Sequence, residues 1–180
     1  VGGYYSVGMH SSIAMRFFPE ILHPLLKQYS HLNLRTELLP SLEVARKVAA
    51  LQLDFGFVIN PLKHPDLVAK KLSSETVGIW GKKVPHEGIL YYHPDMFMVQ
   101  KALKKFSRFR KVPLMDYEVI AQTLQSDEGA VGLLPDEVAK RYDKIKLLHG
   151  KVLEVNLNLI AHKDRLKSQS MKKLFQLLHA

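Results

Sequence analysis

The sequence predicts an α/β fold, in which strands and helices alternate along a chain of 180 residues. Continuous apolar stretches at residues 53–59 and 129–134 are typical of strands buried on both faces of a parallel sheet. A proline or an Asn-Pro pair ends each stretch, and helix-like patterns flank it. The length suffices for one large core or for two small lobes.

The first third of the chain reads as strand, helix, strand, helix, strand. The run at residues 13–29 is amphipathic, and we expect its helix to begin near Ser11 or Ser12. Prolines at positions 19 and 24 predict either a distorted first turn or a regular helix that begins only near position 19. The expected strands are residues 4–8, 33–39 and 53–59, and Ser41 is expected to cap a helix over residues 42–52. Parallel βαβ winding follows from this order.

The rest of the chain continues the alternation, without an internal repeat. We expect strands at residues 68–81, 88–92, 112–115, 129–134, 144–148 and 152–161, the last two around a turn at residues 149–151. The expected helices are residues 96–109, 117–125 behind an Asp116 cap, 136–142 opened by Pro135, and 168–179.

Basic residues outnumber acidic ones, which gives a formal net charge of +9. Such a balance favours acidic ligands, nucleic acid or an anionic partner surface. The densest basic cluster consists of Lys101, Lys104, Lys105, Arg108, Arg110 and Lys111. Two interpretations remain open: a solvated helix face, and a contact with a partner or with the DNA backbone.

The chain has no cysteine, which excludes a disulfide framework and thiolate metal sites and fits a reducing cytoplasm. No apolar stretch approaches the roughly 20 residues that span a bilayer, so we expect no membrane contact. The first residues lack the charged start of a secretory signal and an initiator methionine. We therefore expect the chain to derive from a larger or processed protein.

Polar residues follow the three predicted strands of the first third at their carboxyl ends, where parallel sheets commonly bind ligands. The candidate ligand residues there are His10, Ser11, Ser12, Pro40, Ser41 and Asn60. The imidazole and hydroxyl groups of the first turn, beside helix-terminal amides, suit a carboxylate or another anion. Helix capping and ordinary Asn-Pro turn chemistry are the alternative roles for these residues.

Three segments in this order carry a resemblance to a known family. They are Val7-Gly8 with Ser12 and Phe18-Pro19, then Leu53-Asp54-Phe55-Gly56-Phe57, then Gly129-Ala130-Val131-Gly132-Leu133-Leu134-Pro135. With them the whole chain resembles the effector-binding (regulatory) domain of LysR-type bacterial transcriptional regulators. The resemblance implies a type 2 periplasmic-binding-protein-like fold, with two Rossmann-like lobes joined by two crossover strands. We expect lobe I at residues 1–82 and 155–180, and the inserted lobe II at residues 83–154.

The chain departs from the family pattern in two places. Around residues 82–88 it lacks a longer segment that often contains a His-Pro pair, and this departure bears on the position of the hinge. Ser30 stands where a proline commonly follows the tyrosine, and this change bears on the turn before the next strand.

The resemblance implies a sensing function. A small-molecule effector of unknown identity is expected to bind between the lobes and to control DNA binding by dimers or tetramers of a cytoplasmic, full-length regulator. DNA is then contacted only through an amino-terminal winged helix-turn-helix, which these 180 residues do not include. Because regulatory domains of this family pair antiparallel, the apolar spacing Ile13, Phe17, Ile21 and Leu25 suits either a dimer contact or the core.

The resemblance adds Asp116 and Tyr117 to the candidate effector residues, because they start a helix that faces the ligand in the family. A helix-capping role for Asp116 remains open. If its carboxylate faces the ligand, it disfavours an anionic effector. Trp80 and Tyr92 lie near the expected crossovers, where stacking on a ligand and simple packing are the alternatives.

The sequence does not predict an enzyme. Its nine histidines show no His-Glu-x-x-His or other metal-ligand spacing, and no nucleophile elbow, Walker loop or Gly-x-Gly-x-x-Gly occurs. We therefore expect no catalytic residue, metal or cofactor, and we expect surface positions for His23, His31, His64 and His179. The same fold also occurs in solute-binding proteins of transporters and in some enzymes that build aromatic compounds. A signal peptide at the native gene start would indicate a transport protein, and turnover of a substrate would indicate an enzyme.

Overall fold

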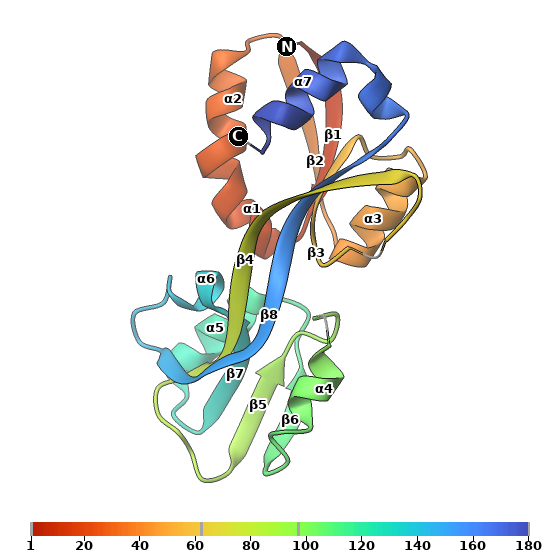
Figure 1. Cartoon of the computed structure of the whole chain (residues 1–180). Helices are drawn as coiled ribbons and strands as arrows, with labels where there is room; N and C mark the ends of the chain where they lie inside the picture. Colours follow the sequence, from red (N-terminus) through yellow and green to blue (C-terminus); the bar gives the residue numbers. More distant parts are fainter. Residues whose placement is uncertain (1, 62, 97, 180) are drawn as a thin grey trace. The chain divides into compact units, whose positions relative to one another are not determined.

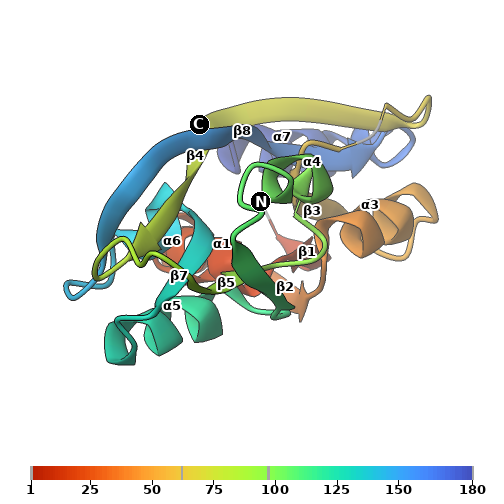
Figure 2. The same cartoon turned by 90° about the horizontal axis from the view of Figure 1, so that it is seen from below.

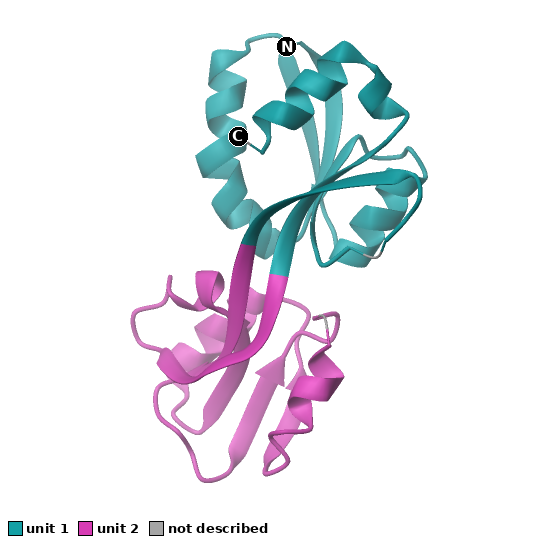
Figure 3. Ribbon diagram, in the orientation of Figure 1, with its two compact units in different colours: residues 1–73, 156–180 teal, residues 74–155 magenta. Residues whose placement is uncertain are grey.

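The computed structural model describes residues 2–61, 63–96 and 98–179, which form two compact units (Figures 1 and 3). Unit 1 comprises Val1–Ser73 and Asn156–Ala180, and unit 2 comprises Ser74–Val155. Two long strands, β4 (Leu67–Gly81) and β8 (Lys146–His162), carry the chain from one unit to the other. The division therefore falls inside these strands, whereas the sequence places the lobe boundaries after residues 82 and 154.

The sheet of unit 1 has the strand order β2-β1-β3-β8. Strands β1 (Gly3–Met9), β2 (Leu32–Leu38) and β3 (Phe55–Ile59) are parallel, and β8 pairs antiparallel with β3. The predicted strands and the parallel winding of the first third are thus confirmed. Met9 is in register with Leu38 and Phe57, so the three parallel strands end at one edge of the sheet.

The first helical segment runs without interruption through both prolines. It consists of α1 (Ser11–Phe17), a π-helical turn η1 (Phe18–Leu22) and α2 (His23–Gln28). The start at Ser11 is as predicted. The expected distortion is present as the π turn around Pro19 and not in the first turn, and the regular helix begins before Pro19. The wider π turn, closed by a hydrogen bond from the His23 N–H to the Phe18 carbonyl, relieves the clash between a proline ring and the preceding turn.

Helices pack on both faces of the unit 1 sheet. The helix α3 (Ser41–Ala49) lies close to β1 and β3, since a Cβ at Gly8 or Gly56 would come within 3.0 and 2.5 Å of the Val44 side chain. The turn η2 (Arg165–Lys167) precedes α7 (Gln169–Leu177), which shares a core with α1 and α2. In this core lie the apolar residues of the predicted stripe, Ile13, Phe17, Ile21 and Leu25.

The sheet of unit 2 has the order β4-β7-β5-β6. Strands β5 (Gly88–Tyr92), β6 (Phe109–Pro113) and β7 (Ala130–Pro135) are parallel, and β4 pairs antiparallel with β7. The helices are α4 (Val99–Leu103), α5 (Tyr117–Ser126) and α6 (Asp136–Ala139). The core of this unit packs α5 and α6 on β7, with Ile120, Leu124 and Leu134 fully buried.

Two predictions for unit 2 are wrong. The expected helix over residues 96–109 is only the five-residue α4, and Phe109 already opens β6, so the six basic side chains do not share one helix face. The expected turn at residues 149–151 is absent, because β8 is one strand of 17 residues. A positive φ of 48° at Lys151 accommodates the irregular backbone there without breaking the strand. Figure 2 shows β8 running beside β4 over much of its length.

The histidines expected at the surface are exposed at positions 23, 31 and 64, and half-buried at position 179. In the part of the chain that the structure describes, no three His, Asp or Glu side chains gather into a group able to hold a metal ion. None of the described helices combines the length and the apolar character needed to cross a membrane.

Candidate functional site

The three turns that follow β1, β2 and β3 meet at the carboxyl edge of the unit 1 sheet. The Leu39 N–H donates to the Met9 carbonyl at 2.9 Å, which joins the first turn to the second. The Ile59 N–H donates to the Ser41 hydroxyl at 3.1 Å, which joins the second turn to the end of β3. The six candidate residues of the first third therefore lie on one sheet edge, as their positions after parallel strands predict.

His10 is the N-cap residue of α1. Its Nδ1 accepts a hydrogen bond from the Ser12 N–H at 3.2 Å and lies 2.9 Å from the Ser12 hydroxyl. Because Nδ1 acts as the acceptor of the cap, a neutral ring carries its proton on Nε2. The capping role is thus confirmed. Ser11 is the first residue of the helix.

Ser41 does not cap α3, which corrects the prediction. The N-cap residue is Pro40, whose carbonyl accepts from the Val44 N–H at 3.0 Å, and no side chain caps this helix. Ser41 is the first helical residue, and its hydroxyl instead accepts the hydrogen bond from Ile59. The amides of the first turn of α3 therefore have no capping side chain at this edge.

Asn60 ends β3 in a left-handed conformation, with φ of 41°. Its Oδ1 accepts from the Asn156 N–H at 2.8 Å, and its own N–H donates to the Asn156 carbonyl at 2.9 Å. These two bonds hold the β3 end against β8. Asparagine tolerates the left-handed region better than most residues, so the residue type follows from the backbone as well as from the hydrogen bonds.

Asp116 is the N-cap residue of α5 in unit 2, which confirms the capping role that the sequence left open. Its Oδ1 accepts from the Glu118 N–H at 2.7 Å and from the Val119 N–H at 3.2 Å. The carboxylate thus satisfies two amides at the positive end of the helix.

Tyr117 lies against His93, a residue that the sequence interpretation missed. Their ring centroids are 4.8 Å apart, at an interplanar angle of 32°. His93 follows β5 directly and is buried, and desolvation lowers the pKa of its imidazole against the opposing effects of Asp95, the Met115 backbone and Asp116. Desolvation likewise raises the pKa of the Tyr117 phenol. Both rings are therefore neutral near pH 7.

Asp136 is the second residue that the sequence interpretation missed. It follows β7 and accepts hydrogen bonds from the Thr76 hydroxyl at 2.8 Å and from the Trp80 indole N–H at 3.2 Å. Trp80 is buried in the core of unit 2, so its role is packing, and Tyr92 is half-buried. The rule that located the turns of unit 1 also points to His93 and Asp136, because each directly follows a parallel strand.

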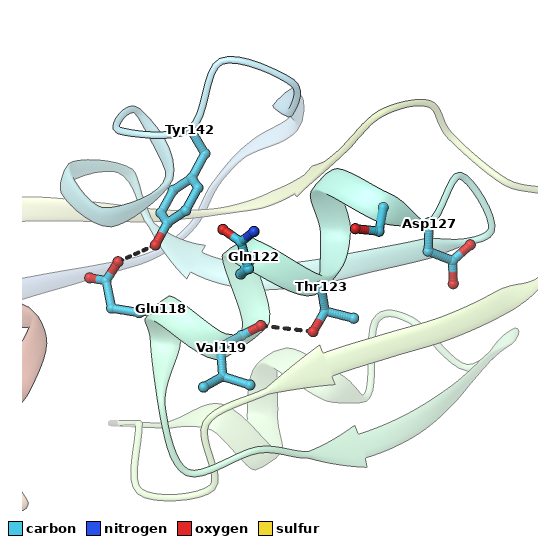
Figure 4. A pocket seen from close by; sticks show the side chains of 7 residues that line it. Glu118, Val119, Gln122, Thr123, Asp127 and Tyr142 are labelled. Carbon is cyan, nitrogen blue, oxygen red and sulfur yellow. Dashed lines mark hydrogen bonds between the residues drawn. The ribbon is translucent and has the colours of Figure 1, made fainter.

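Unit 2 also has a shallow depression of about 710 Å³ on the outer side of α5 (Figure 4). Its lining residues are Glu118, Val119, Gln122, Thr123, Ser126, Asp127 and Tyr142. The Glu118 carboxylate already accepts from the Tyr142 hydroxyl and pairs with Arg141, and desolvation followed by the Glu118 contact raises the pKa of Tyr142 to about 12. None of the eight candidate residues lines this depression.

Comparisons with known proteins bear on the family and on the fold. The profile of the LysR substrate binding domain family matches residues 1–81. No curated protein sequence matches the chain.

Solved structures match over nearly the whole chain. The regulatory domain of MexT, a transcriptional activator in Pseudomonas aeruginosa, has a TM-score of 0.78 at 12% identity and covers 98% of this chain and 96% of its own. The regulatory domain of HypT from Salmonella typhimurium has a TM-score of 0.78 at 14% identity, with 97% and 93% covered. Reduced OxyR2 regulatory domain from Vibrio vulnificus has a TM-score of 0.76 at 13% identity, with 99% and 93% covered.

All three similar structures are regulatory domains, and MexT is a transcriptional activator. The mixed α/β fold, with its eight strands, is the type 2 periplasmic-binding-protein-like fold of LysR substrate-binding domains. The resemblance is therefore supported at two levels: residues 1–81 match the LysR substrate binding domain family in sequence, and the whole chain has the fold of the solved regulatory domains of MexT, HypT and OxyR2.

Proposed function

We propose that this chain is the effector-sensing domain of a LysR-type transcriptional regulator, and that a small polar molecule binds at the carboxyl edge of β1, β2 and β3. One observation carries the proposal: three turns that are far apart in sequence join at this edge through the Leu39 to Met9 and Ile59 to Ser41 hydrogen bonds. The convergence places an imidazole, hydroxyl groups and an amide around the ends of parallel strands, where ligands bind in open α/β sheets.

The chemistry of this edge favours hydrogen bonding over charge pairing. The candidate side chains here carry no carboxylate or ammonium group. The first turn of α3 has backbone amides that no side chain caps, and the His10 imidazole and the Ser41 hydroxyl lie at the same edge. An effector with several oxygen acceptors fits such a donor set. Asp116 and Tyr117 remain predicted effector residues of unit 2.

Regulation by such an effector requires that it bind two states of the full-length protein with different affinities. We expect the full-length regulator to act as a dimer or tetramer. The Ile13, Phe17 and Leu25 side chains are buried within unit 1, so a dimer contact of this helix uses its other side, where Met15 and Phe18 are exposed.

The test is a thermal-shift screen of the chain against organic acids, amino acids, aromatic metabolites and amines. A hit is then measured on His10→Asn, which keeps an acceptor for the Ser12 N–H but removes the imidazole, and on His10→Ala, which removes both. The matched control is His64→Asn, because His64 caps the Asp66 N–H in the same way in an exposed turn.

We expect both His10 variants to lose the ligand-induced shift and His64→Asn to keep it. Loss in His10→Ala alone would mean that the helix cap matters and the imidazole does not. A hit whose shift survives both His10 variants and Ser41→Ala would contradict the proposed position of the site.

A further inference from the structure

Unit 2 has an exposed basic segment, residues 101–111. Lys101 lies on α4, Arg110 and Lys111 lie on β6, and Lys104, Lys105 and Arg108 lie in the turns between them. All six side chains are exposed, and residues 97–115 contain no Asp or Glu. This short segment therefore concentrates six positive charges in a chain whose net charge is +9.

The six cations differ from other basic residues of the chain in their pairing. Lys47 pairs with Glu37 at 2.7 Å, Lys83 with Glu128 at 2.5 Å and Lys163 with Asp66 at 2.5 Å. By contrast, no described carboxylate forms an ion pair with any cation of the basic segment. Their field is therefore not neutralised within the described structure.

The fold holds the backbone of the basic segment in place. Ala102, Leu103 and Phe109 are buried, and the Phe109 N–H donates to the Phe106 carbonyl at 3.2 Å. The Phe106 ring contacts His149 of β8 edge-on, with centroids 6.2 Å apart. Because these contacts anchor the segment to unit 2, the charges sit on a defined surface and not on a free tail.

Protection of a sheet edge explains only part of this cluster. Strand β6 is the last strand of the sheet, and cations on an edge strand discourage pairing with other chains. This explains Arg110 and Lys111. The other four cations lie outside the strand, so edge protection does not account for them.

We propose that the basic segment contacts the phosphate backbone of duplex DNA, without reading bases, when the regulator is bound to its site. The proposal rests on the proposed function, since it needs a transcription regulator. Four of the six cations are lysines, and both phenylalanines face inward or lie half-buried. Protein interfaces are depleted in lysine and enriched in aromatic anchors, whereas phosphate contacts use Lys and Arg, so DNA fits better than an acidic protein. This extends DNA contact beyond the upstream domain that the sequence implied.

The test is fluorescence anisotropy of the intact chain with a short duplex of mixed sequence over a range of salt concentrations. The variant is Lys104→Gln/Lys105→Gln/Arg108→Gln. The control is Lys27→Gln/Lys172→Gln/Lys173→Gln, which removes the same charge from exposed positions of unit 1.

We expect the unmodified chain to bind with Kd of about 10⁻⁴ to 10⁻⁶ M, in the range of non-specific DNA binding. The basic-segment variant should bind at least about 10-fold more weakly, with a salt slope smaller by about 2 to 3, because each phosphate contact contributes about 0.9. The control should bind nearly as tightly as the unmodified chain.

Equal weakening in both triple variants, or no weakening, would overturn the proposal. So would tighter binding of the basic segment to poly-glutamate or to anionic phospholipid vesicles than to DNA. The thermal shift with the effector, measured on the same variants, separates the two proposals. A variant that loses DNA binding but keeps the ligand-induced thermal shift supports both proposals. A chain that binds DNA through the basic segment but shows no thermal shift with any effector supports the DNA contact alone.

Discussion

The carboxyl edges of the two units are built differently, although each follows three parallel strands. In unit 1, backbone N–H groups donate to imidazole, hydroxyl and amide side chains: Ser12 to His10, Ile59 to Ser41 and Asn156 to Asn60. In unit 2, the His93 ring likewise accepts from the Asp95 N–H, but two further acceptors are the carboxylates of Asp116 and Asp136. Uncharged partners join the turns of unit 1, whereas carboxylates cap helices and anchor the strands of unit 2.

This difference indicates a division of roles. The edge of unit 1 has an imidazole, hydroxyl groups and an amide beside helix-terminal amides, which suits recognition of a polar effector by hydrogen bonds. The edge of unit 2 holds a carboxylate that bonds to the buried Trp80, and a pair of neutral rings, His93 and Tyr117. We therefore expect substitutions at the unit 2 edge to affect stability most.

The largest expected effect is that of Asp136→Ala, which removes the acceptor of both the Thr76 hydroxyl and the Trp80 indole N–H. We expect the free energy of unfolding of unit 2 to fall by about 2 to 3 kcal/mol, because hydrogen bonds to charged groups contribute about 1.5 to 3 kcal/mol. Trp80 is the single tryptophan, so urea unfolding followed by its fluorescence reports on this unit. Asp136→Asn, which keeps one acceptor, should lose less, and equal losses in both variants would contradict the assignment.

Next in size is Asn60→Ala at the unit 1 edge. The substitution removes the acceptor for the Asn156 N–H and leaves a residue that disfavours a φ of 41°. We expect a loss of about 1 to 2 kcal/mol in urea unfolding followed by circular dichroism. Asn60→Gly tolerates the backbone and loses only the hydrogen bond, so it separates the two causes. An alanine variant as stable as the unmodified chain would show that this junction does not hold the edge.

A smaller effect is expected for Ser41→Ala, at about 1 kcal/mol, because the Ile59 N–H loses its acceptor. Ser30→Ala is the control, since Ser30 is exposed in the turn before β2. Hydrogen exchange of the Ile59 amide gives the local measurement and should accelerate in Ser41→Ala only. An unchanged exchange rate would contradict the role given to Ser41.

The last prediction concerns the pH dependence of unit 2. Desolvation lowers the pKa of His93 in the folded state, so below the unfolded pKa of about 6.5 the unfolded chain binds more protons. The free energy of unfolding should therefore fall as the pH decreases from about 6.5 toward the lowered folded-state value. The His93 ring accepts from the Asp95 N–H at 3.2 Å, and His93→Asn keeps an acceptor for it. In this variant the free energy of unfolding, followed by Trp80 fluorescence, should depend less on pH. An unchanged slope in that variant would assign the dependence to other groups.

The sequence predicted most strands, because apolar stretches such as those at residues 53–59 and 129–134 match β3 and β7 with small shifts at their ends. It predicted less well where a proline or a glycine favours the end of a helix or strand but the folded chain continues through it. At Pro19 a π turn absorbs the proline, and at Lys151 a positive φ keeps β8 continuous through a Gly-Lys pair. Both are decided by packing and strand pairing far along the chain.

The candidate site shows the same limit. Its location followed from residues placed after parallel strands, and the capping roles of His10 and Asp116 follow from residue type. The partner of the Ser41 hydroxyl, by contrast, lies 18 residues away, and that of Asn60 lies 96 residues away. Such pairings depend on the sheet order, which local pattern does not determine.

The most direct test of the proposed effector site is amide chemical-shift mapping by nuclear magnetic resonance, with a compound found in the thermal-shift screen. Binding at the carboxyl edge of unit 1 predicts the largest shifts at the amides of Ser12, Leu42 and Asn60, with smaller changes elsewhere in unit 1. The α5 depression is the natural comparison, because its volume of about 710 Å³ could hold a small molecule. Largest shifts at Glu118, Gln122 and Asp127, with the unit 1 edge unchanged, would contradict the account.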